Sequence, residues 1–166
     1  MSSIRPLLRL VPDPGSGEPV PQVSFCGHCG QAPPTPMAPL ARVCARCGLG
    51  VVISAGADVA PRKGEAFVIV DRQLKLCGLS RGAERVLGVD EPEAVHRHVS
   101  DFLEPADAEA GQGDELLQSI IAGAAIGGAE PRNIVVRPTG EYGVRYAARV
   151  GSCGPPEGAL IVLGTV

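Results

Sequence analysis

Four of the six cysteines in this chain are arranged as two Cys-x-x-Cys pairs, a spacing that is typical of metal sites. The four residues are Cys26, Cys29, Cys44 and Cys47. A glycine follows each pair (Gly30 and Gly48), and it can take a positive φ that lets backbone N–H groups point at the sulfurs. Four thiolates suit tetrahedral Zn²⁺ and leave no coordination position open. The spacing therefore predicts a structural rather than a catalytic metal site.

Two six-residue stretches carry a family resemblance for this segment. They are Phe25-Cys26-Gly27-His28-Cys29-Gly30 and Val43-Cys44-Ala45-Arg46-Cys47-Gly48. Residues 25–53 thereby resemble the zinc-ribbon or rubredoxin-like knuckle family. Iron fits such a site too, and zinc is preferred because an electron-transfer iron centre is expected to have an aromatic shell, whereas aromatics make up 3% of this chain. Redox dithiols are the other alternative, and two glycine-followed pairs argue against them. We expect the His28 side chain to point outward.

Proline and glycine are concentrated on both sides of the cysteine segment. Residues 1–24 contain five prolines and read as a flexible tail, and residues 54–63 are rich in Gly, Ala and Pro and read as a linker. The rest of the chain, residues 64–166, then forms a second domain. Because the linker has few large apolar side chains, a fragment starting near Pro61 is expected to fold alone.

The second domain shows strand and helix signals in an α+β order. We predict a buried strand over 66–70, a strand over 74–79, a helix from a Ser80 cap to Gly88, a long helix over 114–125, and closing strands over 133–137, 142–150 and 159–166. Such a sheet needs one face covered by the helices.

Residues 64–166 resemble the PAS sensor-domain family. The matching stretches are Ala66-Phe67-Val68-Ile69-Val70-Asp71, Ala83-Glu84-Arg85-Val86-Leu87-Gly88 and Ser100-Asp101-Phe102-Leu103-Glu104-Pro105-Ala106-Asp107, followed by the long helix and the strand triplet. The chain departs from the family at Asp71-Arg72-Gln73-Leu74, where a glycine turn is common, and at Ser80, where asparagine is common.

The resemblance implies a five-stranded antiparallel sheet in the order second, first, fifth, fourth, third, with helices on one face. That order places Cys77 and Cys153 three strand spacings apart, roughly 14 Å, so they are expected to stay free thiols. The flavin and haem patterns of the family are missing, so the cofactor-binding residues stay unknown. Apolar candidates for a ligand pocket, each with core packing as its ordinary role, are Val68, Val70, Leu87, Phe102, Leu117, Ile121, Val144 and Leu163.

Composition narrows the function classes. The net charge of −3 gives no general attraction to nucleic acid or anionic membranes. No apolar run approaches the roughly 18 residues that span a bilayer, and no signal peptide is evident, so a cytoplasmic location with reduced thiols is expected. No Ser/His/Asp, Cys/His or phosphate-loop arrangement appears, so no catalytic residues are assigned and an enzyme is not expected.

These features predict a sensory or regulatory signalling protein. The PAS-like domain would bind a small ligand or a protein partner, with homodimerisation as one form of partnership, and the zinc ribbon would be a structural and interaction module. The alternative is a nucleic-acid-associated transcriptional regulator that uses the ribbon, through Arg42, Arg46 and Phe25.

Overall fold

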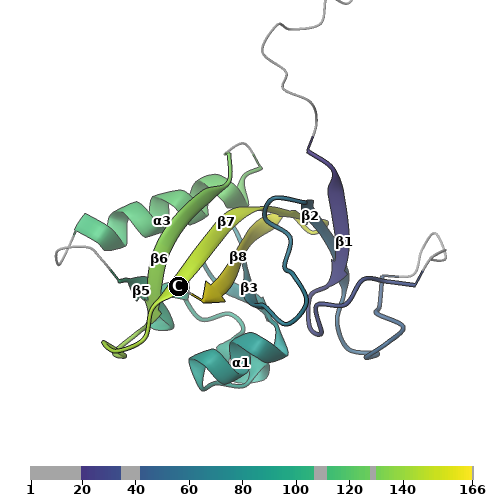
Figure 1. Cartoon of the computed structure of the whole chain (residues 1–166), viewed down its shortest axis with the longest axis horizontal. Coiled ribbons are helices and arrows are strands. Elements are labelled where there is room, and N and C mark those ends of the chain that lie inside the picture. Colours follow the sequence, from purple (N-terminus) through teal and green to yellow (C-terminus); the bar gives the residue numbers. More distant parts are fainter. Residues whose placement is uncertain (1–19, 35–41, 107–111, 128–129, 166) are drawn as a thin grey trace, which may run out of the picture.

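The computed structural model describes residues 20–34, 42–106, 112–127 and 130–165. Its strands are β1 (Gln22–Cys26), β2 (Val52–Gly56), β3 (Ala66–Val70), β4 (Leu76–Leu79), β5 (Leu103–Pro105), β6 (Arg132–Pro138), β7 (Tyr146–Gly154) and β8 (Gly158–Thr165). Its helices are α1 (Arg81–Leu87), α2 (Glu91–Ala94), the 3₁₀ helix η1 (Val99–Asp101) and α3 (Gln112–Ala125). All the strands join one antiparallel sheet (Figure 1).

The five main strands of the second domain lie in the order β4-β3-β8-β7-β6. This order is the second, first, fifth, fourth and third strand of the domain, as the PAS resemblance implies, and the prediction is confirmed. The last strand, β8, occupies the centre, where Val68 pairs with Ile161 and Val150 pairs with the same residue from the other side. The short β5 pairs with the free edge of β6.

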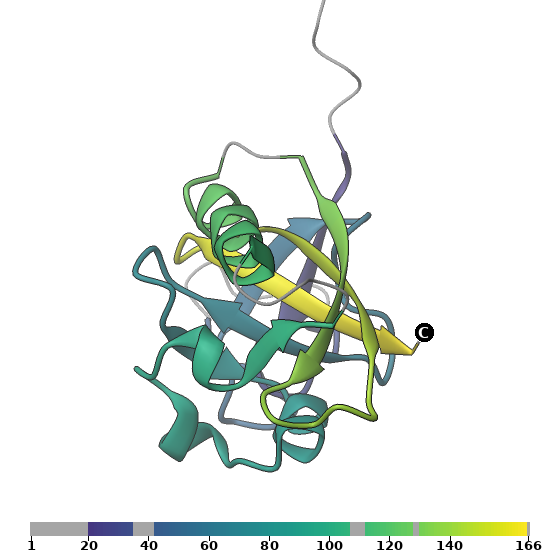
Figure 2. The ribbon, with the colours of Figure 1, turned by 90° about the vertical axis from the view of Figure 1, so that its left-hand side faces the viewer.

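The helices cover one face of this sheet. The apolar side of α3 places Leu117, Ile121 and Ala124 in a core with residues such as Val136 and Val150 of the sheet. Their spacing of three and four residues is the apolar stripe that predicted the helix. Figures 1 and 2 show α3 across this face, which we call the inner face.

The β1–β2 hairpin covers the opposite, outer face. Figure 2 shows it behind the sheet when α3 lies in front. Phe25 and Ile53 of the hairpin are buried in a second core with Phe67 and Leu160 of the sheet. The rings of Phe25 and Phe67 meet edge to face, with centroids 5.4 Å apart. The cysteine segment and the PAS-like part of the chain, which is the second domain from residue 64 onward, therefore share a hydrophobic core.

The hairpin also extends the sheet by hydrogen bonding. Ser54 and Ala55 of β2 pair with Gly154 and Cys153 at the end of β7. Because β6 pairs with the first half of β7, both β6 and β2 use the same edge of this long strand.

The predicted linker over 54–63 differs from the structure. Its first three residues belong to β2, and Val59 and Ala60 are buried in the outer core. Val59 packs directly on Gly151, where a Cβ atom would lie 2.6 Å from Val59 Cγ2. The low content of large side chains suggested a linker, but Val59 is buried here because Gly151 of β7 leaves room for its side chain. The predicted ribbon, 25–53, likewise extends to residues 22–56 as a strand pair, and 1–19 of the predicted tail lie outside the described residues.

Local sequence signals explain both ends of α1 and the turn between β3 and β4. Ser80 caps α1 by accepting a hydrogen bond from the Ala83 N–H, and its hydroxyl also accepts from the Phe67 N–H. Gly88 ends the helix with φ 63°, as expected for a C-cap. In the turn that lacks the family's glycine, Leu74 itself takes φ 61°. Leu74 therefore adopts a left-handed conformation that usually favours glycine.

Candidate metal centre

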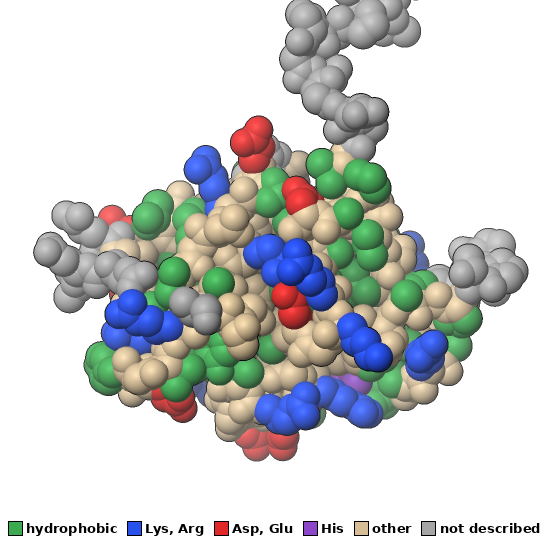
Figure 3. Space-filling view, in the orientation of Figure 1, with side chains coloured by type: hydrophobic (Ala, Val, Ile, Leu, Met, Phe, Trp, Pro, Cys, Tyr) green, Lys and Arg blue, Asp and Glu red, His purple; other side chains and the backbone are tan. Residues whose placement is uncertain are grey.

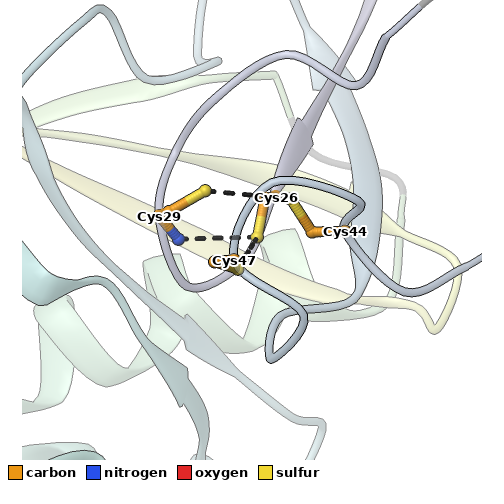
Figure 4. A group of neighbouring side chains, drawn as sticks. All are labelled: Cys26, Cys29, Cys44 and Cys47. Carbon is orange, nitrogen blue, oxygen red and sulfur yellow. Dashed lines mark hydrogen bonds between the residues drawn. The ribbon is translucent and has the colours of Figure 1, made fainter.

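The four predicted ligands come together at the loop end of the β1–β2 hairpin, where Cys26 pairs with Val52 (Figure 4). All four sulfur atoms lie within 4.8 Å of one another. The Cys26–Cys47 sulfurs are 3.7 Å apart and the Cys29–Cys44 sulfurs 3.9 Å apart. A tetrahedron with metal–sulfur bonds of about 2.3 Å has edges of about 3.8 Å. The four cysteines are therefore positioned to bind a single metal ion.

The two Cys-x-x-Cys turns have the same construction. The Gly30 N–H donates to the Cys26 carbonyl and the Gly48 N–H donates to the Cys44 carbonyl, each at 2.9 Å. The two glycines have nearly equal left-handed φ values of 70° and 68°. The positive φ predicted for these two glycines is confirmed.

Backbone N–H groups point at the sulfurs, as the sequence suggested. His28 and Cys29 N–H groups donate to Cys26 Sγ at 3.4 Å, and the Gly50 N–H donates to Cys47 Sγ at 3.5 Å. Such bonds stabilise thiolates and orient them as ligands.

Gly50 is a site residue that the sequence reasoning missed. A Cβ atom here would lie 2.3 Å from Cys26 Sγ and 2.8 Å from the backbone of His28. The residue must therefore be glycine for the second turn to lie against the first. Its position two residues beyond Gly48 was the available signal.

The local environments shift the thiol pKa values of Cys26, Cys29 and Cys47 in different directions. Burial raises the pKa of Cys26 to about 12, and burial also raises the pKa of Cys29. Hydrogen bonds from the N–H groups of Gly50 and Leu49 lower the pKa of Cys47 to about 6. Because metal ligands are thiolates, binding of a cation must displace protons from the buried thiols, and affinity must fall at low pH.

His28 turns away from the sulfurs and toward the PAS-like part. Its Nε2 accepts a hydrogen bond from Arg81 Nε at 3.2 Å, so its Nδ1 carries the proton and faces Glu91 Oε2 at 3.4 Å. The Arg81 N–H also donates to the His28 carbonyl at 3.1 Å. Only 11% of the His28 side chain is exposed. His28 therefore joins the first cysteine turn to α1 and α2, and pointing outward from the metal does not expose it to solvent.

The proposed pocket-wall residues fall into two groups. Most of them belong to the inner core, namely Val68, Val70, Phe102, Leu117, Ile121 and Leu163. Leu87 is partly buried against that core, and Val144 lines an open groove beside α1.

The remaining two cysteines are free, with Cys77 exposed on β4 and Cys153 buried on β7. In the described part of the chain, no helix is long and apolar enough to cross a membrane.

Known proteins match this chain in structure but not in sequence. No family model matches the chain, and no curated protein matches it in sequence. The chain is similar to the PAS domain of the quorum-sensing receptor RpfR from Cronobacter turicensis in complex with C12:0, with 19% identity and a TM-score of 0.46 over 64% of this chain and 97% of that one. It is also similar to the PAS domain of a Desulfitobacterium hafniense protein, with 16% identity and a TM-score of 0.41 over 60% and 90% of the two chains. The assignment of a PAS-like α+β fold rests on the strand order and helix placement described above.

Proposed function

We propose that this protein is a sensory or regulatory module, in which a PAS-like body binds a small ligand or a protein partner. The observation that supports this role is the β4-β3-β8-β7-β6 order with α3 across the inner face, which is the architecture of a sensor domain in the family that the sequence resembles. In this proposal the metal has a structural rather than a catalytic role, because four thiolates leave no coordination position open.

The metal in this proposal is zinc, held by Cys26, Cys29, Cys44 and Cys47. Four sulfur donors at tetrahedral spacing suit Zn²⁺, and the small hairpin needs metal binding to fold firmly. Metal analysis of protein purified under reducing conditions should give one zinc per chain. Stoichiometric iron would replace zinc in the proposal, and the absence of both metals would refute the site.

Native mass spectrometry of freshly purified protein tests the sensory role. We expect the zinc-loaded chain to carry a small molecule or to form a homodimer, since either one gives the PAS-like body a signal to transmit. A monomer that retains no ligand, and that captures none from a metabolite extract, would contradict this role.

Nucleic-acid binding is the second candidate. It is supported by Arg42 and Arg46, both exposed beside the second cysteine turn. Titration with duplex DNA and with single-stranded RNA at rising salt separates the candidates, because nucleic-acid affinity falls steeply with salt. Salt-sensitive binding that is lost in the Arg46→Gln variant would favour the second candidate.

A further inference from the structure

A groove of about 300 Å³ follows the seam between the first cysteine turn and α1. Its walls come from the cysteine turn on one side and from the start of β3 and of α1 on the other. The lining residues that matter here are Gly30, Arg62, Gly64, Arg81, Gly82 and Arg85. The groove lies outside the helix-covered inner face, so a ligand could bind in it whether or not the inner face binds another ligand.

The groove carries an excess of positive charge. Among the described residues, Arg62, Arg81 and Arg85 form no ion pair. Glu65 also lines the groove, but Arg149 binds its two oxygens at 3.0 and 2.6 Å and thereby neutralises it. Figure 3 shows several Lys and Arg side chains gathered over the lower right of this face. The three arginines therefore leave a net cationic site.

One neighbouring contact fixes a cation at the groove, and one glycine leaves space beside it. The Nε–H of Arg81 donates to His28, which fixes the position of this guanidinium at the seam. Gly64 has φ 87°, and a Cβ atom placed there would have no neighbour within 4 Å, so the wall of the groove is open at this point. Open space and one fixed guanidinium therefore occur together.

The groove continues past Gly64, Gly82 and Arg85 into a second hollow of about 460 Å³. This second part is lined by Val86, Val144 and Tyr146, and also by the acidic Glu141, so it suits the organic rather than the anionic part of a ligand. A ligand that spans both parts would place an anionic group among the arginines and an organic group against these side chains.

We propose that this seam groove binds a small organic phosphate. Arginine is suited to phosphate because the planar guanidinium donates two parallel hydrogen bonds to its oxygens, and three such groups surround the first part of the groove. The ligand would contact both the cysteine turn and α1, and would therefore link the metal-bound hairpin to the PAS-like body.

Titration of ¹⁵N-labelled, metal-loaded protein with inorganic pyrophosphate tests the proposal. We expect saturable shifts of the Gly30, Gly64 and Gly82 amide signals, and affinity about tenfold weaker in Arg85→Gln and in Arg62→Gln. Both side chains are exposed, so both variants should fold. Arg132→Gln is the matched control, because it makes the same charge change at an exposed position on β6 outside the groove, and it should bind as the wild type does.

Three results of this titration would overturn the proposal. They are the absence of saturable binding, shifts that map away from the three glycines, and an equal loss of affinity in Arg132→Gln and Arg85→Gln. Citrate provides the chemical control, since its carboxylates match the charge but not the tetrahedral oxygen arrangement. Binding of citrate as tight as that of pyrophosphate would overturn phosphate as the ligand class.

Discussion

The two faces of the central sheet are covered in different ways. Among the described residues, the inner core contains twenty buried side chains, contributed by the sheet, its helices and their connections. The outer core contains nine, and its cover is a two-stranded hairpin of five residues per strand. A hairpin of this size is at best marginally stable by itself. We therefore expect apolar burial alone to hold the inner cover, whereas the outer cover should also depend on the metal proposed to bind the four cysteines.

Removal of the outer cover is the most severe way to break this comparison. A chain beginning at Pro61 exposes Phe67, Ile69, Leu160 and Val162, each worth about 1.5–3 kcal/mol when buried. Their sum is comparable to the whole stability of a small domain. We therefore expect the fragment to aggregate in size-exclusion chromatography or to bind a hydrophobic dye, and to be less stable than the longer chain in urea unfolding. The sequence alone had suggested that this fragment folds by itself.

A chain beginning at Val20 is the matched control, because it keeps the complete hairpin. If the Pro61 fragment instead unfolds cooperatively with the stability of this control, the outer core contributes little and the two parts are independent.

Loss of the metal should have the next largest effect. Cys44→Ser removes one ligand, so we expect metal content to fall to near zero and the free energy of unfolding to fall by several kcal/mol. Hydrogen exchange should rise in β1 and β2 and stay slow in α3. Cys77→Ser is the control, since Cys77 lies outside the metal site and should leave metal content and melting temperature unchanged.

A pair of core substitutions sharpens the comparison. Phe25→Ala in the outer core should cost about 3–5 kcal/mol, and Ile121→Ala in the inner core about 2–5 kcal/mol. After chelation of the metal, the cost of Phe25→Ala should largely disappear because the hairpin has already opened. The cost of Ile121→Ala should remain. Equal behaviour of the two variants with and without metal, measured by urea unfolding, would show that the metal does not control the outer cover.

The ion pair of Glu65 and Arg149 stabilises the outer face by a smaller amount. Hydrogen bonds donated by the Arg149 guanidinium lower the pKa of the Glu65 carboxyl in the folded state. The stabilisation is therefore complete above the unfolded pKa of about 4.3 and is lost as the pH falls through the lower folded value. Glu65→Gln should cost about 1 kcal/mol at neutral pH and nothing in strong acid. Glu157→Gln, which removes the exposed pair with Arg72, should cost close to zero at every pH.

The smallest expected effect is that of mild oxidation on the other two cysteines. β3 and β8 lie between the strands that carry Cys77 and Cys153, so the two thiols lie on well-separated strands. Burial also raises the pKa of Cys153 to about 12, so this thiol ionises poorly. Mass mapping of oxidised monomer should find no Cys77–Cys153 peptide, and finding one would contradict the strand order.

Much of the inner face could be predicted from the sequence. The stripe of Leu117, Ile121 and Ala124 identifies the long helix, Ser80 and Gly88 mark the ends of α1, and the order of strands leads to the PAS-like arrangement. The clustering of Cys26, Cys29, Cys44 and Cys47 was equally accessible, because the spacing of cysteines within a turn is a local property of the chain. These features depend on residues that are close together in sequence.

The cover of the outer face was decided by the tertiary structure alone. The uninterrupted apolar residues of β3 and β8 indicate strands buried on both faces, yet they do not say which segment covers the second face. The contacts of Phe25 with Phe67, of Val59 with Gly151 and of His28 with Arg81 join residues 42 to 92 positions apart. The seam groove arises from the same long-range packing. Residue types along the chain do not specify such meetings, because they depend on how the curled sheet brings distant segments together.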